Sequence, residues 1–346
     1  MPFSWIYGKT TDFRNTLFER GVFKSHSLGA PTVSVGNITV GGTGKTPLTA
    51  FVAEVFAVEG EKVCILTRGY GRENPKERVL VSDGEKILAD ARQAGDEPFE
   101  LARKLLGKAS VVADANRVAA AKWAKENLGV TAFVLDDGFQ HRQAKRDLDI
   151  VLLDATNPFG NSKTLPFGRL REPLENLARA GLIVITRANL VDEEQITNYK
   201  LRITNYNPDC PIFTAQNKIS KLVELKDFLL NIQPTTDHRP PATDPCLAFC
   251  ALGNPGNFFE QLKRENFDLT ATREFGDHHR YTRTDVSKLE AEARKTGAQI
   301  LLTTAKDAVK LAGLKFEMAC YVVESALVFD DEKKLREIIR AVLNRI

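Results

Sequence analysis

The chain has 346 residues, enough for two domains of ordinary size, and 43% of them are hydrophobic, which suffices for a packed core. Its 48 basic and 45 acidic side chains leave a net charge of +3, too small an excess to indicate a nucleic-acid partner. No stretch reaches the roughly 18 apolar residues of a membrane-spanning helix, and we expect no secretory signal.

The first 28 residues mix aromatic side chains such as Trp5 and Phe13 with cations such as Arg14 and Lys24. This mixture suits a helix in a membrane interface, where rings lie at headgroup depth and cations meet anionic lipid. The composition is equally compatible with a helix packed on the first domain. We predict an amphipathic membrane-interface segment over residues 1–28, with simple packing as the alternative.

Residues 29–205 alternate short apolar runs with stretches of helical spacing. The apolar runs predict strands at Thr32–Val35, Val63–Thr67, Ser110–Ala113, Ala132–Leu135, Ile150–Leu153 and Leu182–Thr186. Continuously apolar strands that alternate with helices are typical of a parallel sheet covered on both faces. We therefore predict a doubly wound α/β domain here, a Rossmann-like α/β/α sandwich.

The strongest motif follows the first of these strands, where a glycine-rich turn leads into Lys45 and Thr46 at the start of a helix. Backbone N–H groups in such a turn cradle phosphate oxygens, helped by the positive helix end. Lys45 should reach the outer phosphates of ATP, and the Thr46 hydroxyl should bind Mg²⁺. One position departs from the usual pattern, because Thr39 replaces its first glycine. The predicted nucleotide-binding residues are Gly41, Gly42, Thr43, Gly44, Lys45 and Thr46.

A second motif lies at the end of the predicted strand Ala132–Leu135, which runs into the two acids Asp136 and Asp137. In a P-loop fold, the carboxylate that helps to hold the metal belongs at this place. Thr46 and these acids therefore form the predicted magnesium site, and the pattern leaves open which of the two carboxylates binds the metal.

The character of the chain changes after about residue 190. Residues 191–245 are polar and contain several prolines, which predicts an irregular connection with one short strand around Ile212 and Phe213, and we place the linker at residues 206–245. A second α/β pattern follows and predicts a smaller C-terminal α/β domain over residues 246–346, closed by a helix over residues 331–343.

Several kinds of P-loop protein must be distinguished. Partitioning ATPases carry an extra lysine before the glycines, where this chain has Val40. A GTPase needs a strand that ends in N-K-x-D, and neither 186–189 nor 304–307 matches that pattern well. A kinase needs a group that takes the proton of the acceptor hydroxyl. A switch or metallochaperone that only hydrolyses nucleotide is the second hypothesis.

Two loops supply candidates for the group that takes this proton. The turn Ala94–Pro98 contains Asp96 and Glu97, and the loop Phe275–Tyr281 contains Asp277 and His278. A histidine beside a carboxylate can tune or orient a base. Each loop taken alone is equally compatible with an ordinary solvated turn.

Six motifs together resemble, in order, those of tetraacyldisaccharide 4'-kinase, the lipid A 4'-kinase of Gram-negative bacteria. They are Val35–Pro47, Thr67–Arg72, Ala94–Pro98, Asp136–His141, Leu170–Pro173 and Asp277–His278. The resemblance covers nearly the whole chain. It implies ATP-dependent phosphorylation of the 4'-hydroxyl of a tetraacylated glucosamine disaccharide 1-phosphate, at the cytoplasmic face of the inner membrane.

The resemblance also implies roles for individual residues. Asp96 and His278 match the catalytic dyad of the family, in which the histidine raises the basicity of the aspartate. The residues expected to bind the substrate are Arg72, Glu97, Gln140 and Arg171. At Ala305 this chain lacks the glutamate of the family's T-E-K-D-A-V-K stretch, so no role of that glutamate carries over. ATP and Mg²⁺ are the expected cofactors, and the partners are a glycolipid and a membrane surface contacted peripherally.

Overall fold

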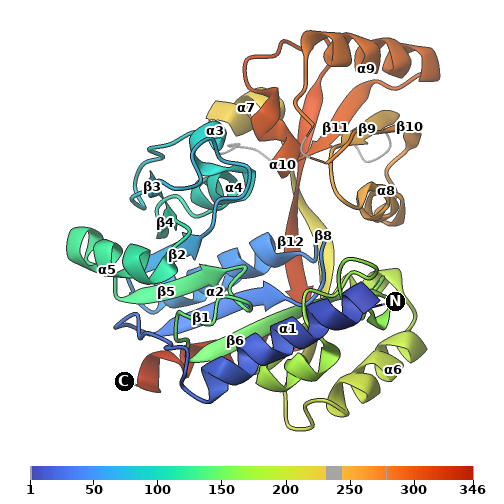
Figure 1. Cartoon of the computed structure of the whole chain (residues 1–346). Helices are drawn as coiled ribbons and strands as arrows, with labels where there is room; N and C mark the ends of the chain where they lie inside the picture. The colour runs from blue at the N-terminus through green and yellow to red at the C-terminus, as the bar shows by residue number, and fades with distance from the viewer. Residues whose placement is uncertain (1, 231–243, 278, 346) are drawn as a thin grey trace. The chain divides into compact units, whose positions relative to one another are not determined.

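The computed structural model divides the chain into two units (Figure 1). The first unit comprises Met1–Gln216 together with Leu327–Ile346, and the second comprises Asn217–Ala326. Strands at the unit boundaries carry the chain from one unit to the other and back. The residues that the structure describes are 2–230, 244–277 and 279–345.

The first unit is built on a largely parallel sheet with the strand order β3-β4-β2-β5-β1-β6-β7-β8. Only β3 runs antiparallel to its neighbour. The strands are β1 (Thr32–Asn37), β2 (Val63–Thr67), β3 (Val79–Ser82), β4 (Ala109–Ala113), β5 (Ala132–Asp136), β6 (Leu148–Asp154), β7 (Leu182–Thr186) and β8 (Ile212–Glu224). The predicted α/β class is confirmed; the short edge strand β3 escaped prediction.

Helices cover both faces of this sheet, as Figure 1 shows. Alternate residues of each strand point to opposite faces, so Val33 and Val35 pack with α2 while Phe133 and Leu135 pack with α5. The helices of the first unit are α1 (Pro2–Glu19), α2 (Lys45–Val58), α3 (Ala91–Ala94), α4 (Asp96–Lys104), α5 (Arg117–Leu128), α6 (Glu193–Thr204) and α11 (Glu332–Arg340). The result is a three-layer sandwich with buried apolar strands.

The strand β1 lies in the middle of this sheet and determines where the site forms. Its Val35 is in register with Asp136 of β5 on one side and with Ile150 of β6 on the other. Because these strands are parallel, the loops after β1 and β5 emerge at the same edge of the sheet. Ligands of open α/β sheets bind at this carboxyl edge.

The C-terminal helix α11 belongs to the first unit, so the structure divides the chain differently from the predicted domain 246–346. Its buried residues Leu335 and Ile339 join the core around α2, and the ring of Phe329 lies 4.8 Å from that of Phe51. Residues Leu327–Ile346 thus complete the core of a unit whose first part, Met1–Gln216, ends more than 100 residues earlier in the chain. The pattern of α11 alone predicts an amphipathic helix but cannot say which core covers its apolar face.

The second unit has a smaller parallel sheet with the strand order β10-β9-β11-β12. Helices flank it, and its core includes Ile219 and Leu222 from the far end of β8. Its remaining elements are α7 (Leu225–Leu230), β9 (Cys246–Cys250), α8 (Pro255–Arg264), β10 (Leu269–Glu274), α9 (Arg283–Thr296), β11 (Ile300–Thr304), α10 (Ala305–Ala308) and β12 (Cys320–Phe329). This confirms a second α/β pattern after residue 245.

The predicted linker 206–245 is largely ordered up to residue 230. The strand β8 extends over 13 residues, where the sequence predicted a short strand around Ile212 and Phe213. Residues of β8 such as Gln216 and Lys221 are exposed, so the strand lacks the continuous apolar run that made the other strands visible. Residues 231–243 of this segment lie outside the described residues.

The helix α1 reverses the usual amphipathic arrangement. The side chains that face the unit are small or polar, such as Ser4 and Asn15, while Phe3, Trp5 and Phe13 are each more than 60% exposed. Ser4 Oγ donates to the carbonyl of Thr164 at 2.8 Å. Among the described helices, none is both long and apolar enough to cross a membrane.

Replacement of Leu335 by alanine tests whether α11 is an integral part of the first unit. Leu335 is fully buried, and loss of its side chain leaves a cavity, so we expect the free energy of unfolding to fall by about 2–5 kcal/mol. The measurement is chemical denaturation, with the exposed Lys333→Ala as the matched control, for which we expect a change within about 0.5 kcal/mol. Equal stabilities of the two variants would contradict the packing described here.

Candidate functional site

The glycine-rich loop after β1 adopts the geometry that a phosphate-binding loop needs. Gly41 and Gly44 have φ of +118° and +83°, a region that glycine occupies without strain. Gly44 is the N-cap of α2, so Lys45 and Thr46 are its first residues. Among the described residues of the loop, Thr39 does not have a positive φ, which explains why a glycine is dispensable there.

Side chains from several strands brace this loop. Asn37, the last residue of β1, donates from Nδ2 to the Thr39 carbonyl at 2.8 Å and to Thr43 Oγ1 at 3.0 Å. Thr186 at the end of β7 donates to the Thr43 carbonyl at 2.9 Å. The next residue, Arg187, donates to the Gly42 carbonyl at 2.8 Å and pairs with Asp154. The loop is therefore held open on its outer side before any nucleotide binds.

The carboxylate of Asp137 connects this loop to the end of β5. Its Oδ1 lies 3.6 Å from Lys45 Nζ and accepts a hydrogen bond from Arg171 Nη1 at 2.7 Å. Burial alone would raise the pKa of Asp137, but Lys45 and Arg171 together hold it below its usual value. Its φ of +50° is uncommon for a residue other than glycine, and such conformations concentrate at functional sites.

The neighbouring Asp136 has a different environment. It is 3% exposed and accepts hydrogen bonds from Thr49 Oγ1 at 3.2 Å and Thr67 Oγ1 at 3.0 Å. Burial, followed by the negative charges of Glu97 and Asp137, raises the pKa of Asp136 to about 6. Three carboxylates thus share one small region at the carboxyl edge of the sheet.

Two glycines explain how Glu97 reaches this region. A side-chain carbon at Gly69 would lie 2.6 Å from the Ala94 carbonyl, and one at Gly95 would lie 2.6 Å from the Tyr70 carbonyl. The loop after β2 and the turn before α4 therefore pack backbone to backbone, which only glycines permit. This contact positions the first turn of α4, which contains Asp96 and Glu97, and the charge of Glu97 acts on Asp136 at the end of β5.

Comparison with known proteins identifies the family of this chain. Residues 1–344 match the family model described as LpxK, tetraacyldisaccharide-1-P 4'-kinase. The chain belongs to this family. Its members are kinases of lipid A biosynthesis, and the functional resemblance predicted from the six motifs is confirmed.

Individual relatives support the assignment over the full length. The tetraacyldisaccharide 4'-kinase of Desulfotalea psychrophila is 36% identical over 92% of this chain and 89% of its own length. That of Geobacter metallireducens is 37% identical over 97% and 95% of the two chains. A crystal structure of LpxK from Aquifex aeolicus in complex with ATP superposes with a TM-score of 0.77 and 31% identity, over 99% of this chain and 98% of that one.

The oxygen atoms at the centre of this kinase fit Mg²⁺. The ion keeps several waters and completes its shell with substrate phosphates, so one hydroxyl and one or two carboxylates suffice. Thr46 at the start of α2 and the acids Asp136 and Asp137 offer this set. Among the described residues no group of three or more His, Cys, Asp or Glu has a metal-binding arrangement, so Mg²⁺ binding here stays a prediction. Burial and the nearby charges of Glu97 and Asp137 raise the pKa of Asp136, and a divalent cation beside it would lower that pKa.

The residues expected to bind the substrate have different surroundings in the kinase. Arg171 Nη1 lies 3.2 Å from Gln140 Oε1, and Gln140 Nε2 donates to the Asn37 carbonyl at 2.9 Å. Arg72 is buried, and its guanidinium donates to the carbonyls of Ala113 and Pro75. These bonds secure the loop after β2, and contact between Arg72 and a sugar stays a prediction.

The predicted catalytic dyad joins residues from different units. Asp96 is half-buried in the first unit, whereas His278 lies outside the described residues, so their partnership stays a prediction. The adjacent Asp277 accepts a hydrogen bond from Lys306 Nζ at 3.3 Å. Lys306 belongs to the stretch that departs from the family pattern at Ala305.

Two charged or polar residues of the site escaped prediction. Asn37 braces the phosphate loop, and its place at the end of a buried strand is the signal that could have revealed it. Arg117 opens α5 and is 4% exposed; burial lowers its pKa, while Asp136 and Asp137 oppose that shift. Arg117 follows the end of β4 at the carboxyl edge of the sheet. This position could have identified it from the sequence as a residue of the site.

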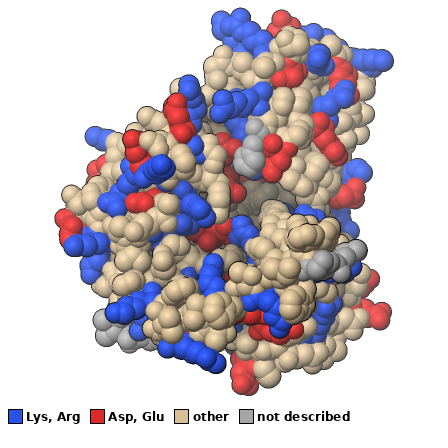
Figure 2. All heavy atoms as spheres, viewed as in Figure 1, with Lys and Arg blue, Asp and Glu red and all other residues tan. Residues whose placement is uncertain are grey.

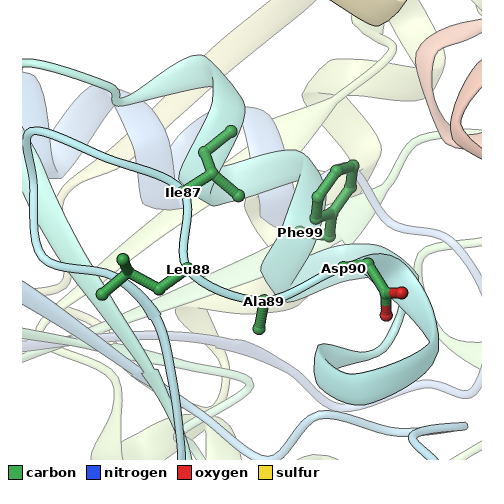
Figure 3. A pocket seen from close by; sticks show the side chains of 5 residues that line it. All are labelled: Ile87, Leu88, Ala89, Asp90 and Phe99. Carbon is green, nitrogen blue, oxygen red and sulfur yellow. The ribbon is translucent and has the colours of Figure 1, made fainter.

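A hollow of about 300 Å³ in the first unit is lined by Ile87, Leu88, Ala89, Asp90 and Phe99 (Figure 3). Its lining is mainly apolar. Figure 3 shows Phe99 projecting from α4 and Asp90 at the turn into α3, where its carboxylate caps the helix by accepting from Arg92 N and Gln93 N. The hollow therefore offers no group free for catalysis, and the chemistry belongs at the edge of the sheet.

The variant Asp136→Asn tests the charge of the site. The folded-state pKa of about 6 exceeds the usual value near 3.9, so the folded protein binds more protons than the unfolded chain between these pH values. Stability from Asp136 is thus present below about pH 4 and lost as the pH rises through 6. In metal-free buffer at pH 8, we expect the free energy of unfolding of the variant to exceed that of wild type by about 1–3 kcal/mol.

The measurement is urea denaturation at pH 8 and at pH 4. The difference between the two proteins should shrink at pH 4, where Asp136 is protonated in the wild type. A variant that is less stable than wild type at pH 8 would contradict the electrostatic account of the acid cluster.

Proposed function

We propose that the chain transfers the γ-phosphoryl group of Mg-ATP to the 4'-hydroxyl of a tetraacylated glucosamine disaccharide 1-phosphate, at the cytoplasmic face of the inner membrane of a Gram-negative bacterium. The observation that carries the proposal is the position of Asp137. This carboxylate ends β5 and contacts both the phosphate-loop lysine, Lys45, and Arg171. A P-loop lysine, a carboxylate suited to metal binding and a second cation are the parts that phosphoryl transfer needs.

The phosphates of ATP would lie along the loop 41–46. Its backbone N–H groups and the positive end of α2 favour negative charge, and Lys45 offers its ammonium to the outer phosphates. Bound Mg²⁺ would supply neutralisation of the charge that develops on the phosphates, held through Thr46 and the acids at the end of β5. Arg171 adds a guanidinium on the same side of Asp137.

The acceptor hydroxyl must lose its proton as its oxygen bonds to the γ-phosphorus and the bond to ADP breaks. Asp96 is the proposed proton acceptor, because it opens α4 next to Glu97, whose charge acts on the acid cluster. The dyad with His278 that the family resemblance implies would raise the basicity of Asp96. General-base assistance of this kind contributes roughly 10²–10⁴-fold to a rate.

The helix α1 supports a location at the membrane surface. Its inner face is anchored by polar contacts: Asn15 is 2% exposed, and its Nδ2 donates to Glu172 Oε2 at 3.0 Å. Its outer face presents Phe3, Trp5 and Phe13. The ring of Phe3 lies 6.4 Å from that of Phe167, which is itself exposed. An exposed aromatic face flanked by cations is the pattern of an interfacial helix.

The view in Figure 2 is consistent with this arrangement. Residues other than Lys, Arg, Asp and Glu make up much of the surface over α1, and both basic and acidic side chains lie beside it. Lys9, Arg20 and Lys24 of this segment are exposed. Such cations near an anionic leaflet add about 1 kcal/mol each to binding. An acceptor with several acyl chains stays in the bilayer, so the enzyme has to meet it there.

The variant Asp96→Asn tests the proposed chemistry. We expect its kcat for transfer to the lipid acceptor to fall about 10²–10⁴-fold, with the Kd for ATP unchanged, because Asn keeps the shape of the side chain but cannot take the proton. Glu100→Gln, one turn further along α4, is the matched control and should retain its kcat. Wild-type kcat in Asp96→Asn would remove Asp96 from the mechanism.

The double variant Trp5→Ser/Phe13→Ser tests the membrane contact. We expect its partition coefficient to anionic phospholipid vesicles to fall about 10-fold or more, because burial of each ring in lipid contributes roughly 2 kcal/mol. Sedimentation with vesicles measures the coefficient. The control is Val58→Ser, which replaces an exposed apolar side chain of another helix. Unchanged partitioning of the double variant would exclude α1 as the membrane contact.

A further inference from the structure

The stretch 304–310, in which Ala305 departs from the family pattern, begins at the carboxyl edge of the sheet in the second unit. The strands β9, β10 and β11 of this sheet are parallel, so the segments that follow them emerge at the same edge. These segments are 251–254 after β9, 275–281 after β10 and the helix α10 after β11. By sequence, 275–281 contains His278, the histidine of the predicted dyad. Contacts at this edge therefore bear on the proposed chemistry.

The segment 275–281 is anchored near both of its ends. Phe275 N donates to the last carbonyl of β9 at 2.9 Å. The ring of His279 stacks on that of Phe275 with centroids 4.7 Å apart, and Tyr281 meets both rings edge to face. His279 Nε2 also lies 3.2 Å from Asp285 Oδ2, in the first turn of α9. Both ends of the segment are thus held by ring packing and hydrogen bonds.

Between these anchors the segment forms a turn whose tip contacts a cation. His279 N donates to the Gly276 carbonyl at 3.0 Å, which closes a tight turn around Asp277. Asp277 Oδ1 lies 3.3 Å from Lys306 Nζ of α10. The segment after β9 also passes close to this carboxylate, since a side-chain carbon at Gly253 would lie 3.4 Å from Asp277 Oδ2. The contact with Lys306 therefore ties the tip of the turn to α10.

The helix α10 is itself held in place by a buried carboxylate. Asp307 is fully buried, and its Oδ2 accepts hydrogen bonds from Thr304 Oγ1 at 2.7 Å and from Ala251 N at 3.0 Å. Its Oδ1 lies 3.7 Å from Lys310 Nζ. Removal of a partner from a buried ion pair is strongly destabilising. Asp307 thus fixes the backbone from which Lys306 reaches Asp277.

The ion pair of Lys306 with Asp277 cannot be explained by stability alone. The side chain of Asp277 is 47% exposed, and that of Lys306 is 17% exposed. Ion pairs that water reaches contribute little to the free energy of unfolding. Their geometry can nevertheless matter for catalysis, because a displacement of about 1 Å can lower a rate by roughly 10²-fold.

We propose that Lys306 is a positioning residue for phosphoryl transfer, an inference that rests on the proposed function. By binding Asp277, it holds the turn that contains this residue and the neighbouring His278 in the shape that the reaction requires. The glutamate that is absent at Ala305 is not needed for this role, since Lys306 and Asp307 make the contacts.

The test measures kcat, the KM values for ATP and for the lipid acceptor in detergent micelles, and the midpoint of unfolding in urea. Lys306→Met removes the charge and keeps the length of the side chain. We expect its kcat to fall about 10- to 100-fold, with both KM values and the urea midpoint unchanged. Lys306→Arg, which can still bind a carboxylate, should keep most of the wild-type kcat. The matched control is Lys315→Met, which removes an exposed lysine of the same unit.

The double variant Lys306→Met/Asp277→Asn shows whether Lys306 acts through Asp277. We expect its kcat to equal that of the slower single variant, because both changes break the same contact. Losses that multiply would overturn the inference, since Lys306 would then act on the substrate directly.

Two results for Lys306→Met alone would also overturn the inference. One is a wild-type kcat, and the other is a loss of kcat accompanied by a lower urea midpoint, which would make Lys306 a structural residue only. Absence of transfer by the wild-type protein is a different outcome, because it would contradict the proposed function on which the inference rests.

Discussion

The site depends on one buried interaction, the contact of Asp137 with Lys45 and Arg171. Two cations near one carboxylate keep it ionised in a place where burial would otherwise protonate it. They come from separate parts of the chain, the phosphate loop and the loop after residue 169, so the carboxylate also ties these loops to the end of β5. Removal of one partner of a buried ion pair strongly destabilises a protein. These three side chains therefore hold the two loops in place before ATP binds.

The rest of the site is arranged around this contact by backbone geometry. Gly69 and Gly95 allow two loops to approach closely where α4 begins, and the charge of Glu97 in its first turn acts on Asp136. Burial of Asp136, followed by the negative charges of Glu97 and Asp137, raises its pKa. A carboxylate buried in this way costs stability in the free protein, which is the stability–function compromise common at active sites.

Much of this architecture could be predicted from the sequence, for identifiable reasons. The phosphate loop and the acids Asp136 and Asp137 follow buried apolar strands, and parallel strands bring their carboxyl ends to one edge. The strand β8 was largely missed because many of its side chains are solvated. The membership of α11 in the first core depends on contacts across almost the whole chain, such as Phe51 with Phe329, which periodicity cannot reveal. The sequence indicated the exposed aromatic face of α1 only through its unusual composition. Ser4 and Asn15, which anchor its inner face, are polar and therefore resemble surface residues in the sequence.

The measurement that tests the account most directly is transfer of labelled γ-phosphate from ATP to the tetraacyldisaccharide 1-phosphate, compared between wild type and Lys45→Ala. The account predicts a phosphorylated lipid with wild type, formed in equal amount to ADP, and none with the variant. Release of free phosphate by wild type without a lipid product would contradict the account and favour a nucleotide-hydrolysing switch.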